Sequence, residues 1–275
     1  MTRRAPMVTI VCMETIQANW YEHPRWYDIA FGWDPSTEVD FVEAAVERFA
    51  DGEVKRIYEP FCGTGRIAIE LARRGYRVTG VDLVPAAVEY GRLRAREAGV
   101  EVEWTLGDAC AFTPPQPIDA IVTLIDSFRL LASAEVAARA AQQFASALRF
   151  GGLLIIGIDI GEKPPLETHE EHWTLERAGT SVETRVFGPG LPGKTPGTSI
   201  ARSILRVTGP GGREYELVTD DEMRDYTMGS FRALFETNAG FELLTLTSRK
   251  YDLDRPIEPA PDHCGDIVAV FRRRG

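Results

Sequence analysis

The chain has 275 residues, of which 44% are hydrophobic and 26% charged, as expected for a globular protein with one large core. Its formal net charge of −10 opposes binding to a phosphate backbone or an anionic membrane surface, and its basic residues are scattered. We therefore expect neither a nucleic-acid nor a membrane partner.

The termini and cysteines give little sign of secretion. The opening segment carries an apolar run shorter than that of a signal peptide, so we expect a frayed leader, with Met7 or Met13 as alternative natural starts. No run approaches the roughly 20 apolar residues of a membrane span. A reducing cytoplasm fits best, because no CxxC pair or regular spacing that would indicate a disulfide framework or a metal site occurs among Cys12, Cys62, Cys110 and Cys264.

Between residues 37 and 160, short β-branched runs alternate with amphipathic runs, which is typical of a parallel sheet covered by helices. A capping box at Thr37 and Asp40 predicts the first helix, and a second at Thr219 and Glu222 predicts a late helix that ends at Gly240. The other expected elements are strands at 56–59, 77–82, 102–106, 120–125, 153–158, 241–249 and 266–272, and helices at 67–74, 85–98 and 133–148.

The segment 161–218 interrupts this alternation. Its runs 173–177, 181–187, 200–207 and 213–218 alternate polar and apolar residues and predict antiparallel strands. The connection 188–199 is so rich in glycine and proline that we expect a mobile loop without regular structure.

A glycine motif, EPFCGTGR at 59–66, stands where the first strand should turn into its helix. Glycines let the backbone approach a ligand and expose amides at a helix N-terminus. Asp82 follows at the distance expected of an acid that holds a ribose hydroxyl, so a nicotinamide-dependent oxidoreductase is one interpretation.

Two carboxylates favour another cofactor. Glu59 precedes the glycines, where it can face a cationic amino-acid group, which a dinucleotide lacks. Asp108 follows the third strand, where it can accept a hydrogen bond from an adenine amine.

Together with GVDL at 80–83, these features resemble the class I S-adenosylmethionine-dependent methyltransferases of the small-molecule type. The resemblance implies an α/β, Rossmann-like fold with a seven-stranded mixed sheet of order 3-2-1-4-5-7-6, its last strand antiparallel. One departure is Phe61, where the family often has glycine. Further matching segments are GDA at 107–109, DAIVTLIDSF at 119–128, LRFGGLLII at 148–156 and AGFELL at 239–244.

By the same resemblance, the glycines cradle the methionine end of S-adenosyl-L-methionine above Glu59, Asp82 holds the ribose hydroxyls, and Leu83 packs on the adenine. The adenine edge is read by Asp108 and the next backbone amide. The implied cofactor-binding residues are Glu59, Gly63, Gly65, Asp82, Leu83, Asp108 and Ala109.

The exit of the fourth strand should face the transferring methyl group, because ligands of open α/β sheets gather at the carboxyl ends of the strands. Asp126, a candidate base, and Ser127 and Phe128, candidate substrate contacts, lie there. The alternative is that they merely turn the chain toward the next helix.

An aromatic segment, 20–31, precedes the first helix. In the small-molecule enzymes that the chain resembles, such a segment folds over the cofactor with a tyrosine near the sulfonium. Tyr21 and Tyr27 are the candidates, as a substrate contact and a catalytic residue respectively. Simple packing of this segment on the sheet is the alternative.

The inserted segment resembles that of glycine-type and nucleotide-sugar N-methyltransferases, in which a small extra sheet roofs the substrate pocket. The run His169 to His172 enters it, and a solvated loop is favoured there over a metal site. His172 remains a candidate general base.

We thus expect four parts: an N-terminal leader and aromatic lid (1–36), a cofactor-binding core (37–160), an antiparallel substrate-side insert (161–218) and the C-terminal part of the core (219–275). The expected activity is transfer of a methyl group from S-adenosyl-L-methionine to nitrogen or oxygen of a small polar molecule. The alternatives are the oxidoreductase and a non-catalytic S-adenosylmethionine-binding protein. A homodimer is left open.

Overall fold

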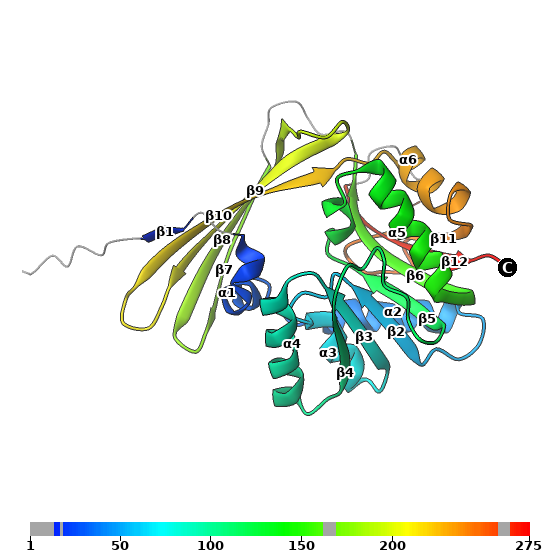
Figure 1. Ribbon diagram of the computed structural model, residues 1–275, viewed down its shortest axis with the longest axis horizontal. Helices are drawn as coiled ribbons and strands as arrows, with labels where there is room; N and C mark the ends of the chain where they lie inside the picture. The colour runs from blue at the N-terminus through cyan, green and yellow to red at the C-terminus, as the bar shows by residue number, and fades with distance from the viewer. Residues whose placement is uncertain (1–13, 17–18, 162–168, 258–264) are drawn as a thin grey trace, which may run out of the picture.

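The computed structural model describes residues 14–16, 19–161, 169–257 and 265–275. It contains a seven-stranded sheet flanked by helices and a five-stranded sheet beside it (Figure 1). The predicted leader and its alternative starts lie within residues 1–13, outside the described residues. Among the described residues, no helix is both long and apolar enough to span a membrane.

The seven-stranded sheet forms the core of the fold. Its strands are β2 (Arg56–Pro60), β3 (Arg77–Asp82), β4 (Val102–Leu106), β5 (Ile118–Thr123), β6 (Leu148–Ile160), β11 (Phe241–Ser248) and β12 (Gly265–Arg273). Their spatial order, β11-β12-β6-β5-β2-β3-β4, is the predicted 3-2-1-4-5-7-6 read from the other edge. β12 runs antiparallel to both its neighbours, while the other pairs are parallel, so the predicted topology is confirmed.

Helices cover both faces of this sheet because successive strand residues point to opposite sides. Ile57 packs with one layer of helices, and the next residue, Tyr58, packs with the other. The first layer contains α2 (Ser36–Phe49) and α3 (Arg66–Arg73); the second contains α5 (Ala134–Ala147), α6 (Met228–Arg232) and the π-helical turn η3 (Ala233–Thr237). Another helix, α4 (Pro85–Ala98), packs against β3 and β4.

The insert forms the second sheet. Its strands are β7 (His169–Arg177), β8 (Thr180–Pro192), β9 (Thr198–Thr208) and β10 (Glu214–Arg224), each antiparallel to the next, as predicted. A short strand, β1 (Glu14–Ile16), joins its edge in parallel with β10.

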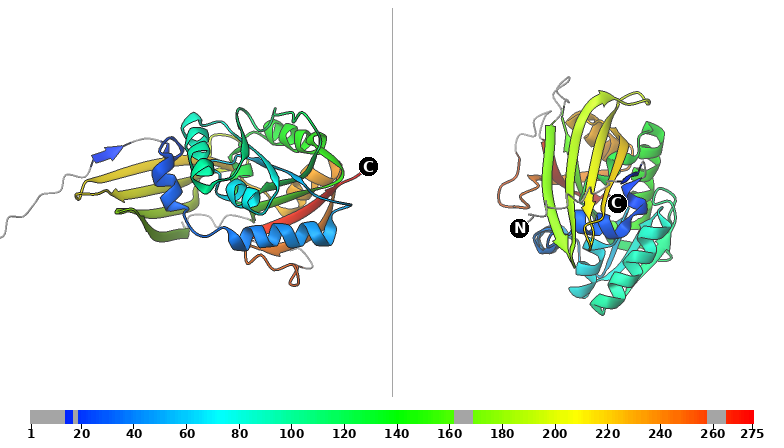
Figure 2. Two further views of the ribbon diagram at one scale, coloured as in Figure 1. Left: turned by 90° about the horizontal axis from the view of Figure 1, so that it is seen from below. Right: turned by 90° about the vertical axis from the view of Figure 1, so that its left-hand side faces the viewer.

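The aromatic segment lies between the two sheets, as the left view of Figure 2 shows. It forms η1 (Trp20–Glu22) and α1 (Pro24–Ala30), and α1 contacts β7 and β8 on one side and α4 on the other. Trp20 and Ile29 pack into an apolar cluster with the inner face of the insert. The segment therefore links the insert to the core.

The two predicted capping boxes are wrong. α2 begins at Ser36, whose backbone N–H donates to the Asp34 carboxylate at 3.0 Å, so the chain turns one residue earlier than Thr37. Thr219 and Glu222 lie within β10, because the insert sheet continues to Arg224 rather than ending at 218.

The late helix instead has a capping box made by Thr227 and Ser230. Thr219 and Glu222 have the residue types and spacing of a capping box, but they lie inside a strand, so the pattern predicted a helix start where there is none.

The prediction of an irregular loop at 188–199 is also wrong. Leu191 pairs with Ile200 and Pro192 with Ser199, so β8 and β9 form a hairpin joined by residues 193–197. A shift in register between Phe187 and Leu191 accommodates the glycines, as a bulge does.

Candidate functional site

The loop after β2 turns through a series of left-handed backbone conformations. Phe61, Gly63 and Gly65 have φ angles of 57°, 52° and 75°. Phe61 is thus a residue other than glycine in a conformation that costs roughly 1–2 kcal/mol. The glycine common at this position in the family would avoid that strain, whereas the Phe61 ring packs against the core beside Phe144.

The glycines of the two motifs, 59–66 and 80–83, have different structural roles. A Cβ on Gly65 would collide with the ring of Trp104, and one on Gly80 would lie 2.9 Å from the Cys62 sulfur. A Cβ on Gly63 would meet nothing within 4 Å. Gly65 and Gly80 therefore allow close packing, while Gly63 leaves an open approach to the backbone.

Asp82 ends β3 and fixes the glycine loop. Its two carboxylate oxygens accept hydrogen bonds from the backbone N–H groups of Gly63, at 2.8 Å, and Val84, at 2.9 Å. Burial raises the pKa of this carboxyl, and the backbone donors partly oppose that effect. A carboxylate offers about four acceptor positions, so Asp82 keeps some acceptor capacity for the hydroxyls of a ligand.

Glu59 is buried at the end of β2. Its Oε2 atom has no hydrogen-bond partner among the described residues, and burial raises the pKa of the group to about 8. An unpaired buried acceptor is costly, so it fits a ligand that brings a donor, such as an ammonium group.

Residues just beyond the ends of β3 and β4 offer surfaces suited to a nucleoside. Leu83 is 64% exposed, an unusual state for a leucine, and offers an apolar surface to a ring. Asp108 is exposed and accepts from the Cys110 N–H at 2.8 Å, while Ala109 is buried. The predicted cofactor residues therefore lie at or just beyond the ends of the adjacent, paired strands β2, β3 and β4, and their roles toward S-adenosylmethionine stay predictions.

A cavity of about 810 Å³ is lined by residues of the core, the aromatic segment and the insert. Four predicted site residues line it: Tyr21, Tyr27, Asp126 and Ser127. The structure therefore brings the two candidate tyrosines and the exit of β5 together around one space. Their catalytic and substrate roles stay predictions.

Tyr27 connects the cavity to the glycine loop. Burial raises the pKa of its hydroxyl, and the negative charges that add to this effect belong to Asp82, Asp221 and Glu59. Its ring lies 5.4 Å from that of Tyr21, between centroids. Tyr27 thus lies within electrostatic reach of both the predicted cofactor residues and the insert.

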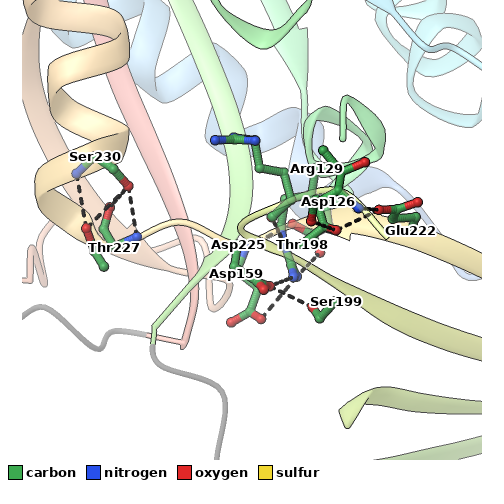
Figure 3. A network of polar contacts seen from close by, with 11 residues as sticks. Asp126, Arg129, Asp159, Thr198, Ser199, Glu222, Asp225, Thr227 and Ser230 are labelled. Carbon is green, nitrogen blue, oxygen red and sulfur yellow. Dashed lines mark hydrogen bonds and ion pairs between the residues drawn. The ribbon is translucent and has the colours of Figure 1, made fainter. Parts of the chain in front are cut away.

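The floor of the cavity is a buried ionic network centred on Arg129, which is 2% exposed (Figure 3). Its guanidinium pairs with Asp126 at 3.0 Å, Asp159 at 3.2 Å and Asp225 at 3.1 Å. Asp126 has a φ of 48° and accepts the Asp159 N–H at 3.0 Å, so this side chain is fixed in place. Burial raises the pKa of Asp126, and Arg129 opposes the shift.

Among the residues predicted for catalysis or substrate binding, two lie away from the cavity. Phe128 is completely buried in the core, where its ring packs 5.4 Å from that of Phe235, so it offers no surface to a substrate. Glu171 and Trp173 line the cavity, whereas His172 alternates to the other side of β7.

The imidazole of His172 is half exposed and lies 3.2 Å from Glu183. The run that contains it is a strand rather than the expected solvated loop, and within the described residues no group of three potential metal ligands gathers.

Asp221 is a cavity residue that the sequence reasoning missed. It lies on β10 two residues beyond Thr219, whose hydroxyl accepts the Trp20 N–H at 3.0 Å, and four beyond the buried Leu217. The alternation of Leu217, Thr219 and Asp221 along one face was the available signal. It was hidden because Thr219 and Glu222 were interpreted as a helix cap.

Residues 57–152 match a family model described as a methyltransferase domain. The ubiquinone biosynthesis O-methyltransferase of Saccharophagus degradans is 29% identical over 103 residues, which are 36% of this chain and 44% of that protein. The chain spans about half the length of the first curated relatives that it matches.

Solved structures resemble nearly the whole chain. An S-adenosylmethionine-dependent methyltransferase from Clostridium acetobutylicum superimposes with a TM-score of 0.73 at 15% identity, covering 93% of this chain and 99% of that one. The sugar N-methyltransferase KedS8 from Streptoalloteichus gives 0.67 at 21% identity, with both chains covered completely. Residues 57–152 thus match a methyltransferase domain, and the chain as a whole has the fold of these S-adenosylmethionine-dependent methyltransferase structures.

Proposed function

We propose that this protein is an enzyme that transfers the methyl group of S-adenosylmethionine to a nitrogen or oxygen atom of a small polar molecule. The observation that carries the proposal is the position of Tyr27, which lines the 810 Å³ cavity and is also within electrostatic reach of Glu59 and Asp82. Tyr27 is therefore a side chain of the acceptor space that is influenced by the charges of the predicted cofactor edge.

The cofactor residues have separate tasks in this proposal. Glu59, with its unpartnered oxygen, binds the ammonium group, and the open backbone at Gly63 lets the methionine end approach. Asp82 uses its remaining acceptor positions for the ribose hydroxyls, and Leu83 covers one face of the adenine. S-adenosylmethionine would supply an electrophilic methyl carbon on a sulfonium.

The cavity residues then orient the acceptor and exclude water. Methyl transfer is an in-line displacement, and holding two reactants in near-attack geometry contributes about 7–11 kcal/mol in well-aligned intramolecular reactions. The fixed network around Asp126 gives one rigid wall, and the aromatic segment gives the other. Tyr27, whose pKa is raised, remains protonated near neutral pH and can donate a hydrogen bond.

The two alternatives are less well supported. Dinucleotide-binding folds of this kind have the strand order 3-2-1-4-5-6, whereas this sheet inserts an antiparallel strand, β12, between β6 and β11. A protein that only binds the cofactor needs no acceptor space, and the large cavity argues against that interpretation.

The proposal is tested with S-adenosylmethionine carrying a radiolabelled methyl group and a panel of small amines, alcohols and carboxylic acids. We expect label to pass to at least one class of acceptor, with S-adenosylhomocysteine formed in equal amount. Binding of the cofactor without transfer to any class, or hydride transfer from a nicotinamide, would count against the proposal.

A further inference from the structure

The cavity wall combines negative charge with aromatic rings. Among the described residues that line it, six are carboxylates, two are arginines and none is a lysine. Trp33, Trp173 and Tyr251 add ring surfaces to those of the two candidate tyrosines. Aromatic faces and carboxylates both attract ammonium ions. The carboxylates are those of Glu38, Asp126, Asp159, Glu171, Asp221 and Asp266.

Both arginines of the wall are already paired. Arg129 lies between Asp126 and Asp159, and Arg249 lies 2.9 Å from Asp266. A phosphate or carboxylate substrate would have to compete with these internal partners and would face the other carboxylates as well. The charge of the wall therefore disfavours anionic acceptors, phosphorylated ones included.

Asp221 differs from the paired carboxylates. Within the described residues it forms no ion pair, whereas its neighbour Asp220 points to the outer face of β10 and pairs with Arg202 at 2.6 Å. Asp221 is half-buried at the cavity surface, where the apolar inner face of the insert becomes polar beyond Leu217. It is thus a carboxylate that a ligand can reach and pair with.

The groups that face Asp221 are acidic or neutral. Tyr21 of η1, Tyr27 of α1 and Asp220 of β10 itself are the groups that interact with it electrostatically. Burial, followed by the charge of Asp220, raises the pKa of Asp221 to about 6, and Tyr21 partly opposes the shift. A carboxylate with this environment is ionised near neutral pH and accepts a proton more readily than an ordinary aspartate.

We infer that the methyl acceptor is a small, unphosphorylated amine that enters the cavity as its ammonium ion, and that Asp221 accepts a proton from that ion before methyl transfer. This inference rests on the proposed function. It names the class of acceptor that the cavity takes and a catalytic residue on the insert.

The step balances as follows. One N–H bond of the ammonium breaks, and the proton passes to the Asp221 carboxylate, leaving a lone pair on nitrogen. That lone pair forms a bond to the methyl carbon while the carbon–sulfur bond breaks. The positive charge moves from sulfur to nitrogen, and S-adenosylhomocysteine leaves as a neutral sulfide. The proton on Asp221 then passes to water.

The acceptor class is tested by calorimetric titration of the protein saturated with S-adenosylhomocysteine. The probes are benzylamine, glucosamine and glycine ethyl ester, each against its hydroxyl counterpart, benzyl alcohol, glucose and ethyl glycolate, with glucosamine phosphate as the anionic probe. We expect at least one amine to bind at least tenfold more tightly than its hydroxyl counterpart, and the phosphate to bind more weakly than glucosamine. Equal or tighter binding of the alcohols or the phosphate, or binding of no amine, would overturn the inference.

The proton acceptor is tested with Asp221→Asn, and Asp220→Asn is the matched control because it removes a neighbouring carboxylate from the outer face. With the amine that binds best, we expect kcat/KM of Asp221→Asn to fall about a hundredfold at pH 7, in the usual range for loss of a general base. The control should stay within threefold of the wild type.

The pH profile separates a base from a structural residue. In the wild type, kcat/KM should rise with a pKa near 6 and then level off, whereas in Asp221→Asn it should keep rising about tenfold per pH unit toward the pKa of the free amine. Parallel profiles would contradict the role of Asp221. If the wild-type protein does not bind S-adenosylhomocysteine, the proposed function itself is refuted.

Discussion

Arg66, the first residue of α3, forms an ion pair with Glu38 of α2 at 2.7 Å, and their side chains are only 10% and 7% exposed. The indole N–H of Trp33 donates to the same carboxylate at 3.3 Å, and the guanidinium lies 5.3 Å from the ring of Trp33. The pair therefore joins the glycine loop to Trp33, which follows the aromatic segment, and to the cavity wall.

We predict that Glu38→Ala lowers the free energy of unfolding by about 3–5 kcal/mol, because it leaves a buried guanidinium without its partner. The control is Asp220→Ala at the exposed pair with Arg202, for which a loss of 1 kcal/mol or less is expected. Denaturant titration measures both. Equal losses in the two variants would contradict the view that burial makes the first pair important.

Gly65→Ala should disrupt the cofactor loop through a steric clash as well as through its φ angle. Gly99, the C-cap of α4, has a similar φ of 69°, but a Cβ there would meet nothing within 4 Å. Gly99→Ala thus shares the backbone penalty of roughly 1–2 kcal/mol without the collision with Trp104. We expect Gly65→Ala to lose more stability and at least tenfold in S-adenosylhomocysteine affinity, with Gly99→Ala retaining that affinity. Similar behaviour of the two would argue against the packing account.

The buried carboxyl of Glu59 predicts a pH dependence of stability. Its folded pKa of about 8 lies above the ordinary value of 4.5, so the folded state retains a proton that the unfolded state loses. This contribution to stability is complete below pH 4.5 and is lost as the pH rises through 8. Relative to Glu59→Gln, the wild type should lose on the order of 1 kcal/mol per pH unit across that window.

Saturation with S-adenosylhomocysteine should reduce this slope, since its ammonium group would stabilise the ionised carboxylate. Thermal or denaturant unfolding of both proteins between pH 5 and 8 measures the effect. If the stability of the wild type and of Glu59→Gln depends on pH in the same way, the predicted contribution of the Glu59 carboxyl is refuted.

Tyr27→Phe tests whether the hydroxyl at the junction of cofactor edge and cavity acts in methyl transfer. Its raised pKa keeps the hydroxyl protonated near neutral pH, so its loss removes a hydrogen-bond donor, an effect of about 1 kcal/mol or roughly fivefold. We expect kcat to fall by at least this factor while S-adenosylhomocysteine binding is unchanged. Tyr90→Phe is the control; it removes a hydroxyl of α4 that donates a hydrogen bond to Asp28 of α1 at 3.3 Å. If Tyr27→Phe has the same kcat as this control, the Tyr27 hydroxyl takes no part in methyl transfer and the ring serves only in packing.

The positions of the predicted cofactor residues in the fold could be inferred from the sequence because their signals are local. Gly65 and Gly80 reflect backbone positions that tolerate no side chain, and Glu59 and Asp82 lie at strand ends where a parallel sheet gathers its polar groups. The seven-stranded order likewise followed from matching segments along the chain, and the structure confirms it.

The cavity could be predicted only in part, because its wall depends on pairing between distant strands. The hairpin of β8 and β9 overrides the local preference of glycine and proline for irregular structure. Which strand residues face the cavity depends on side-chain alternation, which places His172 outside the cavity and Asp221 in its wall. Neither direction can be predicted before the bounds of β7 and β10 are known. Phe128 could not be told from a substrate contact because burial depends on the helices packed above it.

The measurement that tests the central claim most directly is calorimetric titration of the purified protein with S-adenosylhomocysteine, in parallel with NAD and with Asp82→Asn as the control. We predict micromolar binding of S-adenosylhomocysteine that weakens at least tenfold in the variant, and no binding of NAD. Binding of NAD with no response to S-adenosylhomocysteine would contradict the account.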